Sequence, residues 1–315
     1  MDQAALDRYL FERPIRQAEL ARRNSADPTR ANVVTADLTL LARDGSALAA
    51  TRFYPATARG ARRGTVIVAS ATGVKRGFYA HFARHLASLG LEVLTFDYRG
   101  IGGSTAAASD YPPRLRDWGE LDLAGAVEWA LAHGVGPLSI VGHSVGGQLA
   151  GLLPNLERVA ALVLVAAQSG DYRLWPLPGR LAMAAFWYLT IPAASAVFGK
   201  LPAAIGVGHD LPRGVALEWA RWGRTAGYMI GDDPRLARRF AAFRGNLLAF
   251  GVERDGYAPR PAVEWLVERY SGSAEREVRW LAASFGHFGF FRRSRHAQIE
   301  WGVVADALLA SGTAV

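Results

Sequence analysis

The stretch that decides the fold is Pro137-Leu138-Ser139-Ile140-Val141, which runs directly into Gly142-His143-Ser144-Val145-Gly146. The apolar run is typical of a buried strand, and residues 147–153 have the pattern of a helix. Gly142 and Gly146 let the turn between them tighten around a strained serine backbone. Such a turn holds a hydroxyl clear of its surroundings, as a nucleophile requires. We therefore predict that Ser144 is a nucleophile.

The pattern Gly-x-Ser-x-Gly alone is weak evidence, because the chain contains 34 glycines. The alternative is an ordinary glycine turn without chemistry. The preceding strand and the following helix favour the nucleophile, because the sharp turn between those two elements is what exposes the hydroxyl.

Apolar runs alternate with helical patterns from residue 64 onward, which indicates a parallel sheet covered by helices on both faces. The predicted parallel strands are residues 65–69, 92–96, 138–141, 160–166, 246–251 and 277–282. The predicted helices are residues 78–89, 121–133, 147–153, 262–270 and 298–310. Residues 33–42 and 47–54 alternate in polarity around Asp44-Gly45, which predicts an antiparallel hairpin. We expect an α/β fold with an eight-stranded, mostly parallel sheet.

A long segment without a strand pattern interrupts this alternation. The predicted units are a helical extension (1–32), the first part of the core (33–170), a helical insertion (171–244) and the second part of the core (245–315). An insertion at the carboxyl ends of parallel strands lies over the ligand crevice. We expect it to be a lid whose tryptophans bind substrate, namely Trp175, Trp187, Trp219 and Trp222.

Within the insertion, residues 181–198 are uncharged and lie between Arg180 and Lys200, which meets the minimum length of a membrane-spanning helix. Pro192 removes a backbone hydrogen bond and predicts two short helices instead. A span would also separate strands that must join one sheet. We expect a buried or substrate-facing lid without a stable membrane span; a lid that contacts lipid is the alternative.

A nucleophilic serine needs an acid and a histidine later in the chain, in that order. Asp255 follows strand 246–251 in a turn and is the predicted acid, with Glu253 or a merely solvated turn as alternatives. His287 lies between glycines in the loop after the last strand, and we predict that it is the base.

The oxyanion of an acyl-transfer reaction needs two backbone N–H donors. One is expected from Val145, the residue after the serine, and the second from the loop after strand 65–69. Val74 is the predicted second donor and Gly73 is the alternative.

Composition limits the function classes. Of 315 residues, 50% are apolar and 20% charged, which suits a globular protein with a large core. The absence of cysteine excludes disulfides and thiolate catalysis. The net charge is +8, but the basic residues are scattered along the chain with acidic residues between them, so we do not expect a nucleic-acid partner. The first residues lack the layout of a secretory signal, and a cytoplasmic protein is expected.

No cofactor is expected. The glycine-rich turn at residues 100–103 follows a strand, but a dinucleotide-binding spacing would require glycine where Thr105 stands. We also predict no metal in the site.

These motifs resemble the α/β-hydrolase superfamily. The resemblance rests on Thr72-Gly73-Val74, Asp97-Tyr98-Arg99-Gly100, residues 142–147, Asp255 and Gly286-His287. More narrowly, residues 71–79, 117–122, 142–148 and 286–291 resemble a bacterial group of predicted α/β-hydrolases, and more distantly monoacylglycerol lipases and serine aminopeptidases. The resemblance implies Ser144, Asp255 and His287 as the triad. The sequence departs from it at Thr72, where many members carry histidine.

The sequence thus predicts a metal-free serine hydrolase that works through an acyl-enzyme. The tryptophan-rich lid favours a small-molecule carboxylic ester or thioester with an apolar group over a peptide. The alternatives are an acyltransferase with the same triad and a non-catalytic ligand-binding protein on the same fold.

Overall fold

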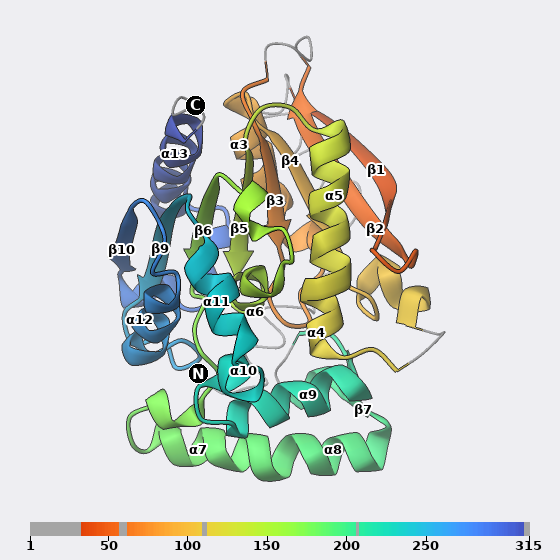
Figure 1. The fold of residues 1–315 in the computed structure, drawn as a ribbon, viewed down its shortest axis with the longest axis vertical. Coiled ribbons are helices and arrows are strands. Elements are labelled where there is room, and N and C mark those ends of the chain that lie inside the picture. The colour runs from red at the N-terminus through yellow and green to blue at the C-terminus, as the bar shows by residue number, and fades with distance from the viewer. Residues whose placement is uncertain (1–32, 57–61, 109–111, 206–207, 312–315) are drawn as a thin grey trace.

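The computed structural model describes residues 33–56, 62–108, 112–205 and 208–311 (Figure 1). The predicted helical extension, residues 1–32, lies outside these residues. An eight-stranded sheet forms the centre, with the strand order β1-β2-β4-β3-β5-β6-β9-β10. The strands are β1 Val33–Leu41, β2 Ala47–Pro55, β3 Thr65–Ala69, β4 Glu92–Phe96, β5 Leu138–His143, β6 Ala161–Val165, β9 Asn246–Val252 and β10 Arg276–Leu281.

Two of the seven strand pairings are antiparallel. The hairpin β1–β2 is one, and β2 against β4 is the other. All remaining neighbours run parallel. The predicted fold, an eight-stranded and mostly parallel sheet that begins with a hairpin, is confirmed.

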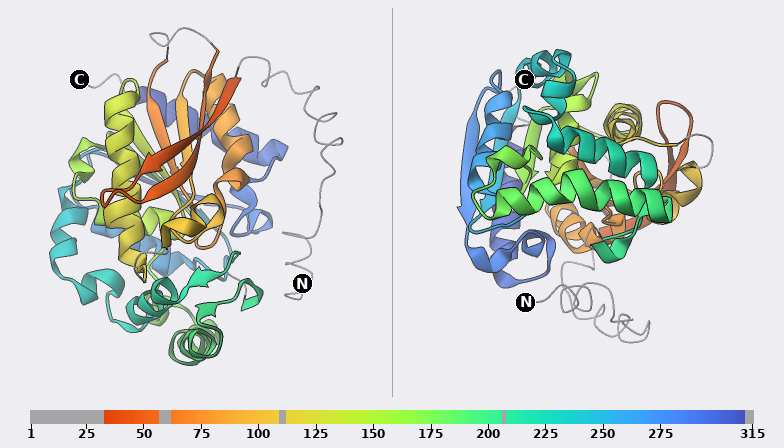
Figure 2. Two further views of the ribbon diagram at one scale, coloured as in Figure 1. Left: turned by 90° about the vertical axis from the view of Figure 1, so that its right-hand side faces the viewer. Right: turned by 90° about the horizontal axis from the view of Figure 1, so that it is seen from below.

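Helices cover both faces of the sheet (Figure 2, left). One face carries α3 (Ala80–Ser88) and α13 (Arg295–Ala310), and the other carries α5 (Ala124–His133), α6 (Val145–Leu149) and α12 (Arg260–Arg269). The short α4 (Leu115–Asp117) continues through a π-helical turn, Trp118–Leu123, into α5. The pleat of a strand sends alternate side chains to opposite faces. In β3, Val66 and Val68 therefore pack with α3 and α13, whereas Ile67 packs with α5.

Residues 171–244 are here called the insertion. Its helices over residues 179–198 and 213–224 lie beyond the carboxyl ends of the parallel strands, and its last helix, residues 235–242, returns along one face of the sheet (Figure 1). The insertion contains α7 (Gly179–Ala185), α8 (Ile191–Phe198), α9 (Arg213–Arg224), α10 (Tyr228–Asp232) and α11 (Arg235–Ala242). It is not free of strands as predicted, because β7 (Lys200–Leu201) and β8 (Leu211–Pro212) pair antiparallel. Two-residue strands are too short to produce a pattern of alternating polarity.

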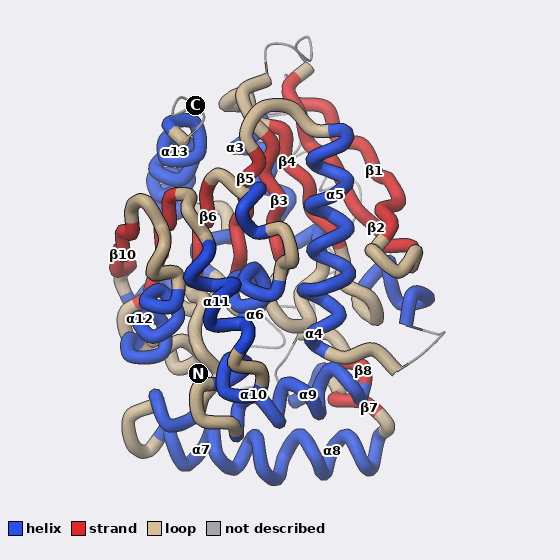
Figure 3. The backbone as a smooth tube through the Cα atoms, viewed as in Figure 1, coloured by secondary structure: helices blue, strands red, loops and turns tan. Residues whose placement is uncertain are grey.

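The prediction that Pro192 divides its segment into two helices is wrong. Residues 179–198 form one unbroken helix in which a π-helical turn, Phe186–Thr190, joins α7 to α8 (Figure 3). Proline clashes with the carbonyl four residues before it in a regular α-helix. The wider π turn directly before Pro192 changes that spacing, so the helix accommodates the proline without a break.

Candidate active site

Ser144 occupies a sharp turn between β5 and α6. Its backbone has φ 50° and ψ −118°, a conformation that non-glycine residues rarely adopt. The turn requires glycine on both sides, because a Cβ on Gly146 would lie 2.2 Å from the carbonyl oxygen of Ala69. On Gly142 it would lie 2.4 Å from the Cα of Gly147. The chain thus holds Ser144 in a strained position that its packing enforces.

The helix after Ser144 begins at Val145, two residues earlier than predicted. As the first residue of α6, Val145 has an N–H without an acceptor inside the helix. That N–H group remains available at the same end of the helix as the serine.

His287 and Asp255 come together from the loops after β10 and β9. The Nδ1–H of His287 donates to Oδ2 of Asp255 over 2.8 Å, and Oδ1 accepts the N–H of Tyr257 over 2.9 Å. Burial acts to raise the pKa of Asp255, but the charge and hydrogen bond of His287 and the backbone N–H groups of Tyr257 and Ala258 outweigh it and hold the pKa below its usual value. Asp255 is therefore ionised and fixes the tautomer of His287 with the proton on Nδ1, leaving Nε2 as an acceptor.

Glu253, the alternative acid, does not reach His287. Its side chain is 47% exposed and forms an ion pair with Arg260 over 2.6 Å. Asp255 is 7% exposed. The structure thus brings Asp255 to the histidine and leaves Glu253 in solvent.

A buried series of hydrogen bonds, which the sequence did not indicate, connects three loops of the site. The N–H of Ala71 donates to the Tyr79 hydroxyl over 2.8 Å, and this hydroxyl lies 3.0 Å from Nδ1 of His143. Nε2 of His143 lies 2.9 Å from the carbonyl oxygen of His287. Since a carbonyl can only accept, Nε2 of His143 carries the proton and Nδ1 accepts from Tyr79.

His143 stays neutral in this position. Burial and the nearby His287 lower its pKa from 6.5 to about 3, against the smaller opposing effects of the His287 carbonyl and Asp255. The hydrogen bonds from Ala71 through Tyr79 to His143 therefore keep one arrangement of protons at neutral pH. They tie the loop after β3 to the loop of His287.

The prediction of Val74 as an oxyanion donor disagrees with the structure. The N–H of Val74 donates to the carbonyl of Ala71 over 3.1 Å and closes a turn in which Gly73 has φ 67°. A turn of this kind uses the N–H of its fourth residue. Neither Val74 nor Gly73 borders the cavity at Ser144, whereas Ala71 and Thr72 do. The N–H of Thr72 makes no backbone hydrogen bond within the described residues.

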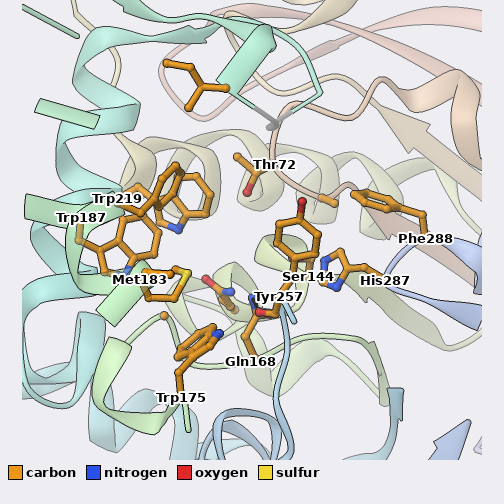
Figure 4. A pocket seen from close by; sticks show the side chains of 16 residues that line it. Thr72, Ser144, Gln168, Trp175, Met183, Trp187, Trp219, Tyr257, His287 and Phe288 are labelled. Carbon is orange, nitrogen blue, oxygen red and sulfur yellow. Dashed lines mark hydrogen bonds between the residues drawn. The ribbon is translucent and has the colours of Figure 1, made fainter. Parts of the chain in front are cut away.

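A cavity of about 300 Å³ opens beside Ser144 and His287 (Figure 4). Three of the four predicted tryptophans border it, namely Trp175, Trp187 and Trp219. The other large apolar side chains on its wall were not predicted: Met183, Phe186, Ile205, Tyr257 and Phe288. Met183 and Phe186 belong to the uncharged run, whose helical phase could have placed them on the same face as Trp187.

Trp222 does not border the cavity, contrary to the prediction. It is fully buried, donates from Nε1 to Asp232 over 3.2 Å and packs edge-on against Tyr228. Trp219 and Trp222 lie three residues apart on the same side of α9, but Trp219 contacts Trp187 at the cavity, whereas Trp222 contacts Tyr228 and Asp232. Trp222 is therefore part of the core of the insertion.

Two glutamines add polar groups to the cavity wall. Gln168 donates from Nε2 to the carbonyl of Tyr257 over 3.1 Å, and its Oε1 has no hydrogen-bond partner within the described residues. Gln148, on α6, accepts at Oε1 from the hydroxyl of Tyr228 over 2.8 Å. Trp175 similarly donates from Nε1 to the carbonyl of Gly256 over 2.9 Å. The insertion is thus hydrogen-bonded to the elements that carry Ser144 and Asp255.

No group of three or more His, Asp or Glu side chains is arranged to hold a metal ion in the part of the chain that the structure describes.

A sequence profile of the alpha/beta hydrolase fold matches residues 66–198. No curated protein matches the chain. Similar solved structures include a brefeldin A esterase, described as a bacterial homologue of human hormone-sensitive lipase, with 18% identity, a TM-score of 0.59 and coverage of 99% of this chain and 87% of that one.

An esterase of Pyrobaculum calidifontis has 16% identity and a TM-score of 0.60, with 98% of this chain and 93% of that chain covered. An esterase of Pyrococcus furiosus has 16% identity and a TM-score of 0.58, with 87% and 90% covered. At these identities the likeness is one of fold.

Proposed function

We propose that the chain, which has the α/β-hydrolase fold, is a serine hydrolase that cleaves a carboxylic ester or thioester through an acyl-enzyme. Ser144 is the nucleophile, His287 the base and Asp255 the group that orients it. The cytoplasmic location expected from the sequence stays a prediction.

One observation carries the proposal. A serine in a strained turn and a histidine bonded at Nδ1 to a buried, ionised aspartate border the same cavity. Figure 4 draws Ser144 and His287 side by side at its edge. This is the arrangement that turns a weakly nucleophilic hydroxyl into a reactive one.

The reaction follows from the position of each proton. Nε2 of His287 takes the proton of Ser144 as Oγ bonds to the substrate carbonyl carbon, whose oxygen gains the electron pair. When this intermediate collapses, the bond to the alcohol or thiol breaks and the leaving group takes the proton from His287. Water then attacks the acyl-enzyme in the same way and releases the carboxylic acid and free Ser144.

The negative oxygen of the intermediate needs two N–H donors. We assign them to Val145 and, in place of Val74, to Thr72. Supporting this assignment, the N–H of Val145 has no acceptor within α6, and Thr72 borders the cavity with its N–H unpaired among the described backbone groups.

The cavity wall supports an apolar acyl or alcohol group. The insertion supplies seven of the sixteen residues that border the cavity, the three tryptophans among them, and is proposed to be the lid over the site. No Asp, Glu, Lys or Arg borders the cavity within the described residues, so a charged peptide terminus finds no partner there. An apolar ester or thioester fits this lining better than a peptide does.

A fluorophosphonate probe tests the assignment. We expect it to label the wild-type protein at Ser144 and to leave Ser144→Ala unlabelled, while Ser46→Ala, in the β1–β2 turn, labels like wild type. Hydrolysis of p-nitrophenyl esters of increasing chain length then measures the preference for apolar groups. A folded wild-type protein that is not labelled would exclude the serine mechanism.

A further inference from the structure

The outer face of the helix Gly179–Phe198 is apolar and exposed. Its large side chains Leu181, Leu189 and Val197 are 67%, 67% and 74% exposed. They recur at intervals of eight residues, with exposed Ala185 and Ala193 halfway between, so that one stripe runs along the whole helix. We call these five residues the outer stripe. Tyr188 and Phe198, 50% and 60% exposed, widen it.

The opposite face of the same helix packs inward and borders the cavity. Trp187 and Ile191 are buried, and Met183, Phe186 and Trp187 border the cavity beside Ser144. The helix is long and apolar enough to cross a membrane, with a mean hydropathy of 1.6. Because its inner face packs on α9 and forms the cavity wall, the folded protein presents only its outer face. That geometry suits a helix lying on a membrane surface and not across it.

The charge of the insertion indicates what covers the outer stripe. The insertion has ten basic and five acidic residues, so it carries +5 of the net charge of +8 in less than a quarter of the chain. Arg180 and Lys200 flank the uncharged run at its two ends, and Lys200 forms an ion pair with Asp210 over 2.5 Å. Apolar side chains bordered by cations match a bilayer with anionic headgroups, where the apolar groups enter the acyl boundary and the cations remain at the headgroups.

A second copy of the chain suits the outer stripe less well. A two-fold symmetric contact places the same surface on both partners. Since the insertion carries a net charge of +5, either relative direction of two stripes brings two positively charged surfaces together. Anionic lipid meets the same cations with opposite charge.

We propose that the outer stripe docks the protein on an anionic lipid surface. Seen from below, the helix lies across the face of the molecule that is farthest from the sheet, so nothing in the core obstructs a flat surface there (Figure 2, right). The docked helix then has lipid on one side and the cavity on the other. The inference rests on the proposed function only for its consequence, which is that apolar substrate enters from the lipid.

Co-sedimentation with vesicles tests the docking. We expect the full chain to bind phosphatidylcholine vesicles that contain phosphatidylglycerol, and to bind pure phosphatidylcholine more weakly. The variant Leu181→Ser/Leu189→Ser should lower the partition coefficient by about tenfold or more. Raising the salt from about 0.1 M to about 0.5 M should weaken wild-type binding, because the salt screens the cations.

The matched control is Leu41→Ser/Ile299→Ser, which removes two leucine-sized side chains that are 62% and 65% exposed on β1 and α13. We expect its partition to stay within about twofold of wild type. Equal losses in both variants, or no wild-type binding to either vesicle, would overturn the docking. So would a wild-type dimer that ignores vesicles and becomes monomeric in Leu181→Ser/Leu189→Ser on sedimentation velocity.

Fluorophosphonate labelling and hydrolysis of p-nitrophenyl acetate without vesicles separate the two proposals. Both variants should keep these activities, because none of the four residues borders the cavity. Vesicle binding without labelling would reject the serine hydrolase and keep the docking. Labelling without vesicle binding would reject the docking and keep the serine hydrolase.

Discussion

The two regions that meet at the cavity differ in how they are held. In the loops after β3, β5, β9 and β10, buried hydrogen bonds fix the groups around Ser144, as in the pair His287–Asp255 and the chain through Tyr79 and His143. The insertion contributes mainly apolar side chains and a basic surface. Hydrogen bonds fix the orientation of the groups around Ser144, whereas apolar contacts limit the size and shape of the group that the cavity can hold. We therefore expect changes in the loops to alter kcat and changes in the insertion to alter KM.

The largest expected effect is that of Asp255→Asn. Loss of the carboxylate leaves His287 free to take the wrong tautomer, and we expect kcat to fall by about 10⁴-fold on p-nitrophenyl butyrate. Glu253→Gln, two residues away and exposed, is the control and should change kcat by less than about twofold. If the Glu253 variant lost activity and the Asp255 variant kept it, the acid would be misassigned.

The next effect concerns His143 and pH. A histidine with a folded pKa of about 3 and an ordinary value of 6.5 binds more protons when the chain is unfolded, so it costs stability as the pH falls from 6.5 toward 3. Between pH 7.5 and 4.5 we expect this residue to cost wild type about 2 to 3 kcal/mol in the free energy of unfolding. Urea unfolding of wild type and His143→Gln at both pH values measures it. Equal pH dependence in the two proteins would contradict the low pKa.

A smaller effect is expected from Tyr79→Phe, which removes the hydroxyl between Ala71 and His143. Because the loop after β3 then loses its link to the loop of His287, kcat should fall by about tenfold with KM nearly unchanged. Tyr98→Phe is the control, since the buried Tyr98 hydroxyl has no hydrogen-bond partner within the described residues. Steady-state kinetics of both variants would reject a positioning role if Tyr79→Phe changed only thermal stability.

The smallest effect tests the insertion. Trp219→Phe removes apolar surface from the cavity wall, and we expect about 1 kcal/mol, or roughly fivefold, in KM for a long-chain ester, with kcat retained. Trp222→Phe should instead lower the melting temperature and leave the chain-length preference unchanged, because Trp222 is bonded to Asp232 away from the cavity. A similar KM change in both variants would show that the contact with Trp219 does not determine the preference for ester chain length.

The sequence predicted what depends on local pattern. Buried strands and the turn at Ser144 have apolar runs and glycines that can be recognised directly, and Asp255 and His287 follow from their places after strands. Thr72 could not be found in this way, because the decisive fact is which N–H closes the turn at Gly73. Trp219 and Trp222 share one side of α9, and only the tertiary contacts of each ring decide which of the two borders the cavity. The exposure of Leu189 and Val197 likewise depends on which face of their helix packs inward.

The hydrogen bonds from Trp175 to Gly256 and from Tyr228 to Gln148 tie the insertion to the core near Ser144 and Asp255. The first ends one residue from Asp255, and the second ends on the helix that follows Ser144. A hinge motion of the whole insertion would break both bonds and pull on the turn that contains Asp255 and on α6. Between these two bonds, Glu218 of α9 also accepts the N–H of Arg116 in the core over 2.8 Å. We therefore expect substrate traffic to pass through a local rearrangement of the helix Gly179–Phe198 while the hydrogen-bonded parts of the insertion stay in place.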